Sequence, residues 1–174
     1  MTLDMIKPQL RIELDDNSLD DTLQPLIIAA REWCEGYQNR AYIKQTIEMA
    51  LDSWPCDSTI KLPRPPLIDV VTLSYTDIDG TTTTWPGSNY IVDDFAEPAR
   101  LVKVHGVNWP SVCLASTNGI VVRYEAGYGE DASAVPQRIK QAIILLVSHW
   151  FENGMCDPPP AVLSLLRLDR VVPV

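Results

Sequence analysis

The sequence predicts an α+β fold in which helices at both ends of the chain, packed as an α-helical bundle, flank a β-rich middle of short antiparallel strands and hairpins. Apolar residues recur every three or four positions near both ends, whereas they alternate with polar residues after residue 43. Prolines and an Asp-Gly pair interrupt the middle. We therefore expect a single domain over residues 1–174, with helical parts at about 1–37 and 135–170 and a β-rich insertion at about 43–130.

The N-terminal part predicts a short helix over residues 2–10 and a longer amphipathic helix that begins near Ser18 or Asp20. Gly36 stands where a helix needs a left-handed terminating residue, so we expect the longer helix to end near Glu35. Its apolar residues follow the spacing of a single helical face: Leu19, Leu23, Leu26, Ile27, Ala30, Trp33 and Cys34.

The middle of the chain has the two-residue period of half-buried strands, most clearly over residues 43–51. Asp79-Gly80 is a strong signal for a two-residue hairpin turn. The prolines between Leu62 and Leu67 keep that stretch extended. The expected strands after it are 68–78, 81–84, and shorter ones near 89–93, 100–104 and 119–126.

The last third turns helical again, because Val135-Pro136 suits a helix start and an apolar face follows. Further apolar residues lie off that face, so the helix should be buried, either in the core or against a neighbouring copy of the chain. The candidate interface or core residues are Ile139, Ile143, Ile144, Leu146, Trp150 and Phe151. A last short helix over 161–169 and an apolar tail over 171–174 complete the chain.

The formal net charge of -9, from 23 acidic and 14 basic residues, argues against a dedicated nucleic-acid binder. DNA can still pass such a surface without sticking to it. No apolar run approaches the length of a membrane span, and the N-terminus does not have the pattern of a secretory signal. The four cysteines are far apart, which favours reduced thiols in a cytoplasm.

Signals for catalysis, cofactors or metals are weak. Gly127-Tyr128-Gly129 begins a formal match to a dinucleotide motif, but a glycine turn explains it better because no βαβ unit surrounds it. His105 and His149 are the only histidines, and neighbours such as Ser148 and His149 point in different directions on a helix. We expect no catalytic, cofactor-binding or metal-binding residue and no enzyme. A nucleotide-dependent enzyme that uses the Gly127 turn remains an alternative.

Three Trp-Pro pairs begin at Trp54, Trp85 and Trp109. Tryptophans in loops can stack on single-stranded bases, but the basic groove of such proteins is missing here. The preferred interpretation is that each indole anchors its loop on a sheet. A monomeric protein-binding module that uses these loops remains a second alternative.

Five segments follow one another in a fixed order: Ala30 to Tyr37 with Arg40-Ala41-Tyr42, Leu62 to Leu67, Tyr124 to Gly129, Val135-Pro136 with Ala142 to Val147, and His149 to Asn153. In this order and spacing they resemble the head–tail connector (adaptor, head-completion) proteins of tailed double-stranded DNA bacteriophages and prophages. The resemblance spans nearly the whole chain. Residue 154 departs from the pattern, since Asn153 is followed by Gly154 where an Asn-Arg pair is expected.

This resemblance implies a structural subunit of the virion, made in the bacterial host cytoplasm and placed at the head–tail interface. It implies a homo-oligomeric ring of about a dozen copies that docks beneath the portal and extends the DNA channel. The ring would offer an attachment surface to a stopper or tail-completion protein. It would bind no cofactor, and DNA would pass through without specific binding.

Residues 161–174 are the candidate portal-docking segment, because they combine leucines with arginines in the only part of the chain that is not net acidic. A packed terminal helix is an equally good interpretation, since terminal helices are commonly tied to a core. The candidate docking residues are Leu163, Leu166, Arg167, Leu168 and Arg170.

Overall fold

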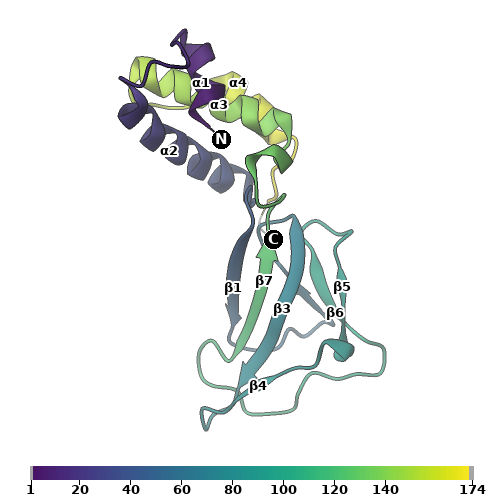
Figure 1. The fold of residues 1–174 in the computed structure, drawn as a ribbon. Helices are drawn as coiled ribbons and strands as arrows, with labels where there is room; N and C mark the ends of the chain where they lie inside the picture. The colour runs from purple at the N-terminus through teal and green to yellow at the C-terminus, as the bar shows by residue number, and fades with distance from the viewer. Residues whose placement is uncertain (1, 173–174) are drawn as a thin grey trace. The chain divides into compact units, whose positions relative to one another are not determined.

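The computed structural model describes residues 2–172 and divides into two compact units. Unit 1 combines residues 1–40 with residues 131–174, and unit 2 is the stretch between them, 41–130. The α+β class is confirmed, because helices occupy the N-terminal and C-terminal segments and the middle forms two antiparallel sheets (Figure 1). The assignment of all 174 residues to a single domain stays a prediction.

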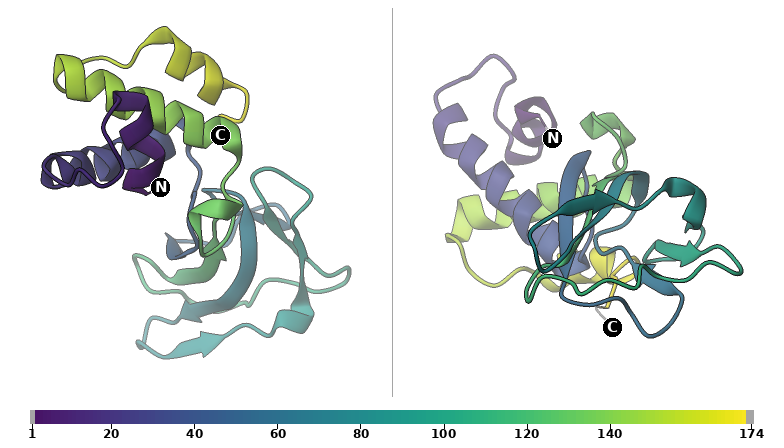
Figure 2. Two further views of the ribbon diagram at one scale, coloured as in Figure 1. Left: turned by 45° about the horizontal axis from the view of Figure 1, so that its top comes forward. Right: turned by 90° about the horizontal axis from the view of Figure 1, so that it is seen from below.

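Unit 1 is helical. Figure 2 shows α4 beside α3, and α2 also packs against α3. None of the helices within residues 2–172 is long and apolar enough to cross a membrane. The helices are α1 (Leu3–Ile6), η1 (Lys7–Leu10), α2 (Asp20–Gln38), η3 (Ala132–Ala134), α3 (Gln137–Asn153) and α4 (Pro160–Arg167).

The longer N-terminal helix, α2, ends later than the sequence predicts. Gly36 lies inside the helix, and the left-handed residue is Asn39, with φ of 54°. Its backbone N–H bonds the carbonyls of Glu35 and Gly36 and so closes the last turn. Asparagine tolerates this conformation better than most residues, so the glycine is not needed there.

The core of unit 1 forms where α2 and α3 meet the short helices α1 and α4. Leu23 and Ala30 on α2 and Ile6 at the end of α1 are fully buried. Each fully buried large apolar side chain contributes about 1.5–3 kcal/mol to folding. Residues from α3 supply most of the remaining core: Ile139, Ala142, Ile143, Ile144, Leu146, Val147 and Trp150.

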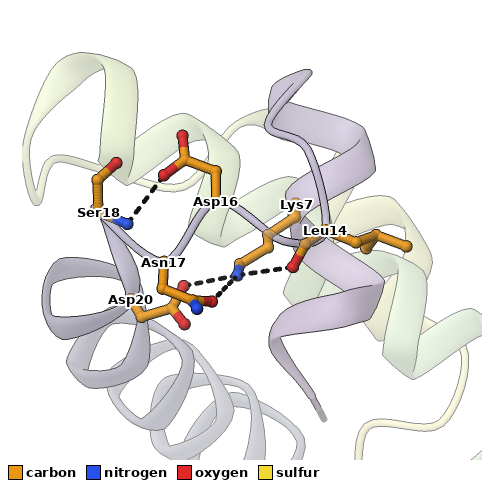
Figure 3. Close-up of polar contacts among 6 residues, drawn as sticks. All are labelled: Lys7, Leu14, Asp16, Asn17, Ser18 and Asp20. Carbon is orange, nitrogen blue, oxygen red and sulfur yellow. Dashed lines mark hydrogen bonds and ion pairs between the residues drawn. The ribbon is translucent and has the colours of Figure 1, made fainter.

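A buried lysine fixes the loop between η1 and α2 (Figure 3). Lys7 is 2% exposed, and its Nζ lies 2.8 Å from Oδ1 of Asp20. The ammonium also donates to Oδ1 of Asn17 at 3.1 Å and to the carbonyl oxygen of Leu14 at 3.3 Å. A buried charge needs such partners, so Lys7 holds the acidic loop against the helices of unit 1.

Next to this lysine, the Asp16 carboxylate accepts a hydrogen bond from the backbone N–H of Ser18 at 2.9 Å. Hydrogen bonds from Ser18 lower the pKa of Asp16. The turn before α2 is therefore held by an aspartate side chain, whereas the residue before the helix, Leu19, offers no side-chain cap.

Unit 2 contains two antiparallel sheets, one of order β1-β7-β3-β4 and one of order β2-β6-β5 (Figure 1). The strand β2 was not predicted from the sequence. The other strands occur where the sequence predicts them, with ends that differ by one or two residues. The strands are β1 (Gln45–Leu51), β2 (Thr59–Lys61), β3 (Leu67–Thr76), β4 (Thr82–Thr84), β5 (Tyr90–Asp93), β6 (Arg100–Lys103) and β7 (Ile120–Ala126), and η2 (Gly87–Asn89) precedes β5.

The strand β1 shows the alternation predicted for a half-buried strand. Side chains from Gln45 to Leu51 are alternately half-buried and exposed, with Ile47 and Met49 on the inner face. The strand β7 lies between β1 and β3 and pairs with both. Its own side chains alternate between buried and less buried positions, so β7 forms the centre of this sheet.

The core of unit 2 takes side chains from both sheets. Leu73 of β3 and Leu101 of β6 are fully buried, and so are the inward-facing residues of β7. Tyr124 on β7 is 1% exposed, and its hydroxyl donates to the carbonyl oxygen of Pro63 at 2.7 Å. Burial raises the pKa of Tyr124 to about 12. The hydrogen bond to Pro63 therefore satisfies the hydroxyl, which is the only polar group of the tyrosine side chain in this apolar interior.

Candidate functional site

The apolar helix that was proposed as an interface or a core element is α3, and it lies inside unit 1. The side chains of Ile139, Ile143, Ile144 and Leu146 are each at most 7% exposed, Trp150 is 6% exposed, and Phe151 is half-buried. Packing within one chain accounts for this burial. A role of these residues between copies therefore stays a prediction, and it would involve Phe151 more directly than the others.

The five candidate docking residues divide into two groups. On α4, Leu166 is fully buried and Leu163 is half-buried. Arg167, Leu168 and Arg170 are exposed, and Leu168 exposes 76% of its surface. The apolar side of α4 therefore packs on unit 1, while its end presents one leucine and two arginines to solvent.

Polar contacts tie the C-terminal segment to the end of α2. The side chain of Gln38 donates to the Leu166 carbonyl at 2.7 Å, and the side chain of Asn39 donates to the Val171 carbonyl at 2.8 Å. Arg40 donates to the Asp169 carbonyl at 2.6 Å. These contacts join residues about 130 positions apart, so the segment has the properties of a packed terminal helix. Pro173 and Val174, the end of the predicted docking segment, lie outside the described residues.

Two charged contacts complete this attachment. Arg138 at the start of α3 forms an ion pair with the Asp169 carboxylate. The guanidinium of Arg170 lies 4.8 Å from the ring centroid of Tyr37, a cation–π contact. Arg170 is thus partly engaged within unit 1, which leaves Arg167 and Leu168 as the most available of the candidate docking residues.

The three Trp-Pro tryptophans come together in one cluster in unit 2. The rings of Trp54 and Trp109 stack with centroids 4.7 Å apart, and Trp85 lies 4.9 Å from Trp109. Tyr75 and Tyr90 extend the cluster. The indoles pack on one another and on the core, which agrees with loop anchoring and leaves few ring faces for a ligand.

Unit 2 also exposes apolar side chains on an edge strand and just after it, here called the β5 strip, which the sequence does not predict. The strand β5 is an edge strand, and Ile91 and Val92 are 58% and 40% exposed. Phe95, just after the strand, is 98% exposed. Next to it, a hydrogen bond from Arg100 lowers the pKa of Asp93. Edge strands are seldom left so apolar, and nothing in the residue pattern distinguished Phe95 from a core residue.

The glycine turn that resembled a nucleotide motif has a structural explanation. Gly127 has φ of 135°, and a Cβ there would lie 2.6 Å from backbone atoms of Ile43 and Lys44. The strand before it, β7, is central in an antiparallel sheet, whereas the dinucleotide motif belongs to a parallel βαβ unit. The glycine is therefore required by the close approach of two backbone segments.

Within residues 2–172, no group of three or more His, Cys, Asp or Glu side chains could hold a metal ion. Lys44 forms ion pairs with Glu125 at 3.1 Å and Glu130 at 3.6 Å. The hydrogen bond to Glu125 is the main cause that raises the pKa of Lys44. These acids next to the Gly127 turn thus have a cation partner within unit 2.

Several chains in solved structures share this fold, and three of them are described here. A chain in the neck of an empty GTA particle computed with C6 symmetry has a TM-score of 0.82 and 23% identity, over 100% of this chain and 91% of that one. A chain in the neck of the native GTA particle computed with C12 symmetry has a TM-score of 0.76 and 24% identity, over 98% and 90%. A chain in the virion of the native gene transfer agent (GTA) particle has a TM-score of 0.74 and 25% identity, over 89% and 79%.

Neither a protein-family model nor a curated protein matches the sequence. The structural matches nevertheless cover nearly the whole chain, so they include both units and not a single common motif. The resemblance found in the sequence is thus confirmed at the level of the fold, because the chain shares its fold with components of the neck of a gene transfer agent particle.

Proposed function

We propose that this chain is a non-enzymatic structural subunit of a phage-like virion neck. Copies form a closed ring of about a dozen around the DNA channel, dock beneath the portal and offer their other face to a stopper or tail-completion protein. The observation that carries this proposal is the match of the whole chain to a neck component at a TM-score of 0.82. On this proposal the two units act together as one connector domain, made in the host cytoplasm and incorporated in the virion.

The C6 and C12 symmetry of the matching necks supports the ring. Heterologous contacts between identical subunits generate a closed ring when the rotation between neighbours closes. Such contacts need exposed surface that the monomer does not already use. The exposed strip of β5 with Phe95 and the exposed end of α4 with Leu168 provide two such surfaces on different units.

The net charge of -9 supports a passive channel wall. Acidic surfaces repel the phosphate backbone, so DNA moves past them without releasing counterions and without binding tightly. The ring on this proposal extends the channel and adapts the portal surface to the next component. No step requires a cofactor or a bond-breaking residue.

For portal docking, the exposed end of α4 is the best candidate. Leu168 and Arg167 are both exposed, in a segment whose buried side is already packed on unit 1. An exposed leucine beside a cation suits a partner groove with an apolar floor and an acidic rim. The double variant Arg167→Ser with Leu168→Ser removes both features without touching the buried Leu166.

Co-sedimentation with the cognate portal protein tests this role. We expect the double variant to weaken portal binding by about tenfold or more, since a well-placed anchor residue contributes at least 1.4 kcal/mol. The control is Phe95→Ser, which changes an exposed apolar residue of unit 2. Unchanged portal binding in the double variant would contradict docking by α4, and loss of binding in the control alone would assign docking to the β5 strip.

A further inference from the structure

The end of α3 brings together a thiol, an imidazole and an amide in unit 1. The Sγ atom of Cys156 lies 3.2 Å from Nε2 of His149, and the side-chain nitrogen of Asn153 lies 3.3 Å from Nδ1 of the same ring. His149 and Asn153 are one helical turn apart on α3, and Cys156 follows in the loop. From the sequence, His149 is a candidate only as a metal ligand or as a partner of Ser148, and neither the contact with Cys156 nor that with Asn153 is predicted.

The Asn153 contacts determine which ring nitrogen of His149 carries the proton. Asn153 Nδ2 also donates to the backbone carbonyl of His149 at 3.0 Å, and a carbonyl can only accept. The side-chain atom near the ring is therefore the NH₂ group, and its second hydrogen points to Nδ1. Nδ1 must then be the acceptor, so the neutral ring carries its proton on Nε2, the atom that faces Sγ.

This arrangement directs an N–H donor at the sulfur of Cys156. A hydrogen bond donated to sulfur stabilises the negative charge that sulfur carries when it attacks an electrophile. The Cys156 backbone is also fixed, because its N–H donates to the Gly154 carbonyl at 2.8 Å and its carbonyl accepts from the Trp150 indole at 2.8 Å. Sγ is thus held beside the imidazole, and the residue is exposed to solvent.

The other three cysteines provide internal controls. Cys34 is fully buried, and burial raises the pKa of its thiol to about 12, which makes it inert. Cys56 and Cys113 are exposed like Cys156. Across residues 2–172 only two histidines occur, and the hydrogen bonds of the structure join neither of them to Cys56 or Cys113.

We propose that Cys156 is the reactive thiol of this protein and a site of reversible modification by low-molecular-weight disulfides, with His149 as donor to the sulfur and Asn153 as the positioning residue for the ring. In the reaction the thiol loses its proton to solvent, the thiolate attacks one sulfur of the disulfide, and that S–S bond breaks. A mixed disulfide forms at Cys156, and the second half of the reagent leaves as a thiolate. This inference goes beyond the neck role and does not depend on it.

The test uses the intact protein and glutathione disulfide, with the modified fraction of each cysteine followed over time by peptide mass spectrometry. Rates are normalised to those of the same cysteines in urea-unfolded protein, which removes local sequence effects. We expect Cys156 to react about three- to tenfold faster than Cys56 and Cys113, because the hydrogen bond from His149 stabilises the negative charge on sulfur during the attack.

Two variants separate the hydrogen bond from simple exposure. His149→Leu should lower the Cys156 rate to that of Cys56 and Cys113, with those two rates unchanged. Asn153→Ala should lower it less, and nitrogen NMR of His149 should change from the Nε2–H form to a mixture of tautomers. Equal normalised rates at the three exposed cysteines, or a Cys156 rate that His149→Leu leaves unchanged, would overturn the proposal.

Discussion

The two units are built from the chain in different ways. Unit 2 is one uninterrupted stretch, residues 41–130, whereas unit 1 needs both ends of the chain. Contacts inside unit 1 therefore join residues about 130 positions apart, such as Gln38 with Leu166. Closing so long a separation costs conformational entropy, so unit 1 must recover it through packing of its end segments. The C-terminal segment is therefore a structural part of unit 1 as well as a candidate docking element.

The units also differ in what they leave exposed. Unit 1 buries most of its long apolar helix α3 and exposes Leu168 with Arg167 beside it. Unit 2 packs its mostly half-buried aromatic cluster on the core, and it leaves Ile91 and Val92 on an edge strand and Phe95 just after it in solvent. An apolar edge strand invites pairing with another chain. Each unit therefore exposes a surface of different chemistry.

The largest expected effect comes from deletion of residues 161–174. This change removes Val162 and Leu166, both fully buried, and each buried leucine-sized side chain contributes about 2–5 kcal/mol. We expect unit 1 to unfold while unit 2, with its own core, remains folded. The measurement is amide NMR, in which signals from 41–130 should stay dispersed and those of unit 1 should collapse. A deletion variant with native helix content would show that the segment contributes only to docking.

Matched leucine truncations test the separation of the two cores. Leu146→Ala in α3 and Leu73→Ala in β3 each remove a fully buried leucine and should each cost about 2–5 kcal/mol. Each variant should lower the stability of its own unit only, as followed by residue-resolved hydrogen exchange. Equal losses in both units from either variant would mean that the units unfold as one cooperative body.

Alkaline pH should affect the units in different ranges. The pKa of Cys34 in unit 1 is raised from 9.0 to about 12, so its stabilising effect is complete below pH 9 and declines between pH 9 and 12. For Tyr124 in unit 2 the pKa rises from 10.0 to about 12, so the decline begins near pH 10.

At pH 10.5 the contribution of Cys34 to the free energy of unfolding of unit 1 should be about 2 kcal/mol smaller than below pH 9. Hydrogen-exchange or chemical-denaturation curves at pH 8 and 10.5 measure this change. The variant Cys34→Ala lacks the titrating thiol, so its stability should depend less on pH over the same range. Parallel pH profiles of the wild type and Cys34→Ala would contradict this account of the buried thiol.

The smallest effect on stability is expected at the exposed apolar residues. Phe95→Ser in unit 2 and Leu168→Ser in unit 1 change side chains that are 98% and 76% exposed, so each should alter the free energy of unfolding by no more than about 0.5 kcal/mol. Thermal denaturation measures this directly. A loss of several kcal/mol in either variant would mean that the residue packs within the monomer.

Periodicity made the long elements predictable from the sequence. The strict alternation of apolar and polar residues predicted the position of β1, and the apolar face after Val135 predicted that of α3. The end of α2 was wrong, because glycine is the usual left-handed residue but Asn39 takes that role. The strand β2 was missed since three residues are too few to show a period.

The surfaces were harder to predict than the elements. Whether α3 faces a core or a neighbouring copy depends on what covers it, and the buried side chains of unit 1 are supplied by both chain ends. The contacts of Asn39 and Arg40 with the C-terminal segment join residues that are far apart in the chain, so no pattern in the nearby sequence predicts them. The same holds for the cluster of Trp54, Trp85 and Trp109, whose residues lie on separate loops.

Electron microscopy of the protein bound to its cognate portal is the most direct test of the proposed ring. We expect closed rings of about a dozen copies in end views, coaxial with the portal. Free monomer in dilute solution is compatible with the ring, provided that the portal induces its assembly. A single bound copy or an open filament on the portal would contradict the proposed ring.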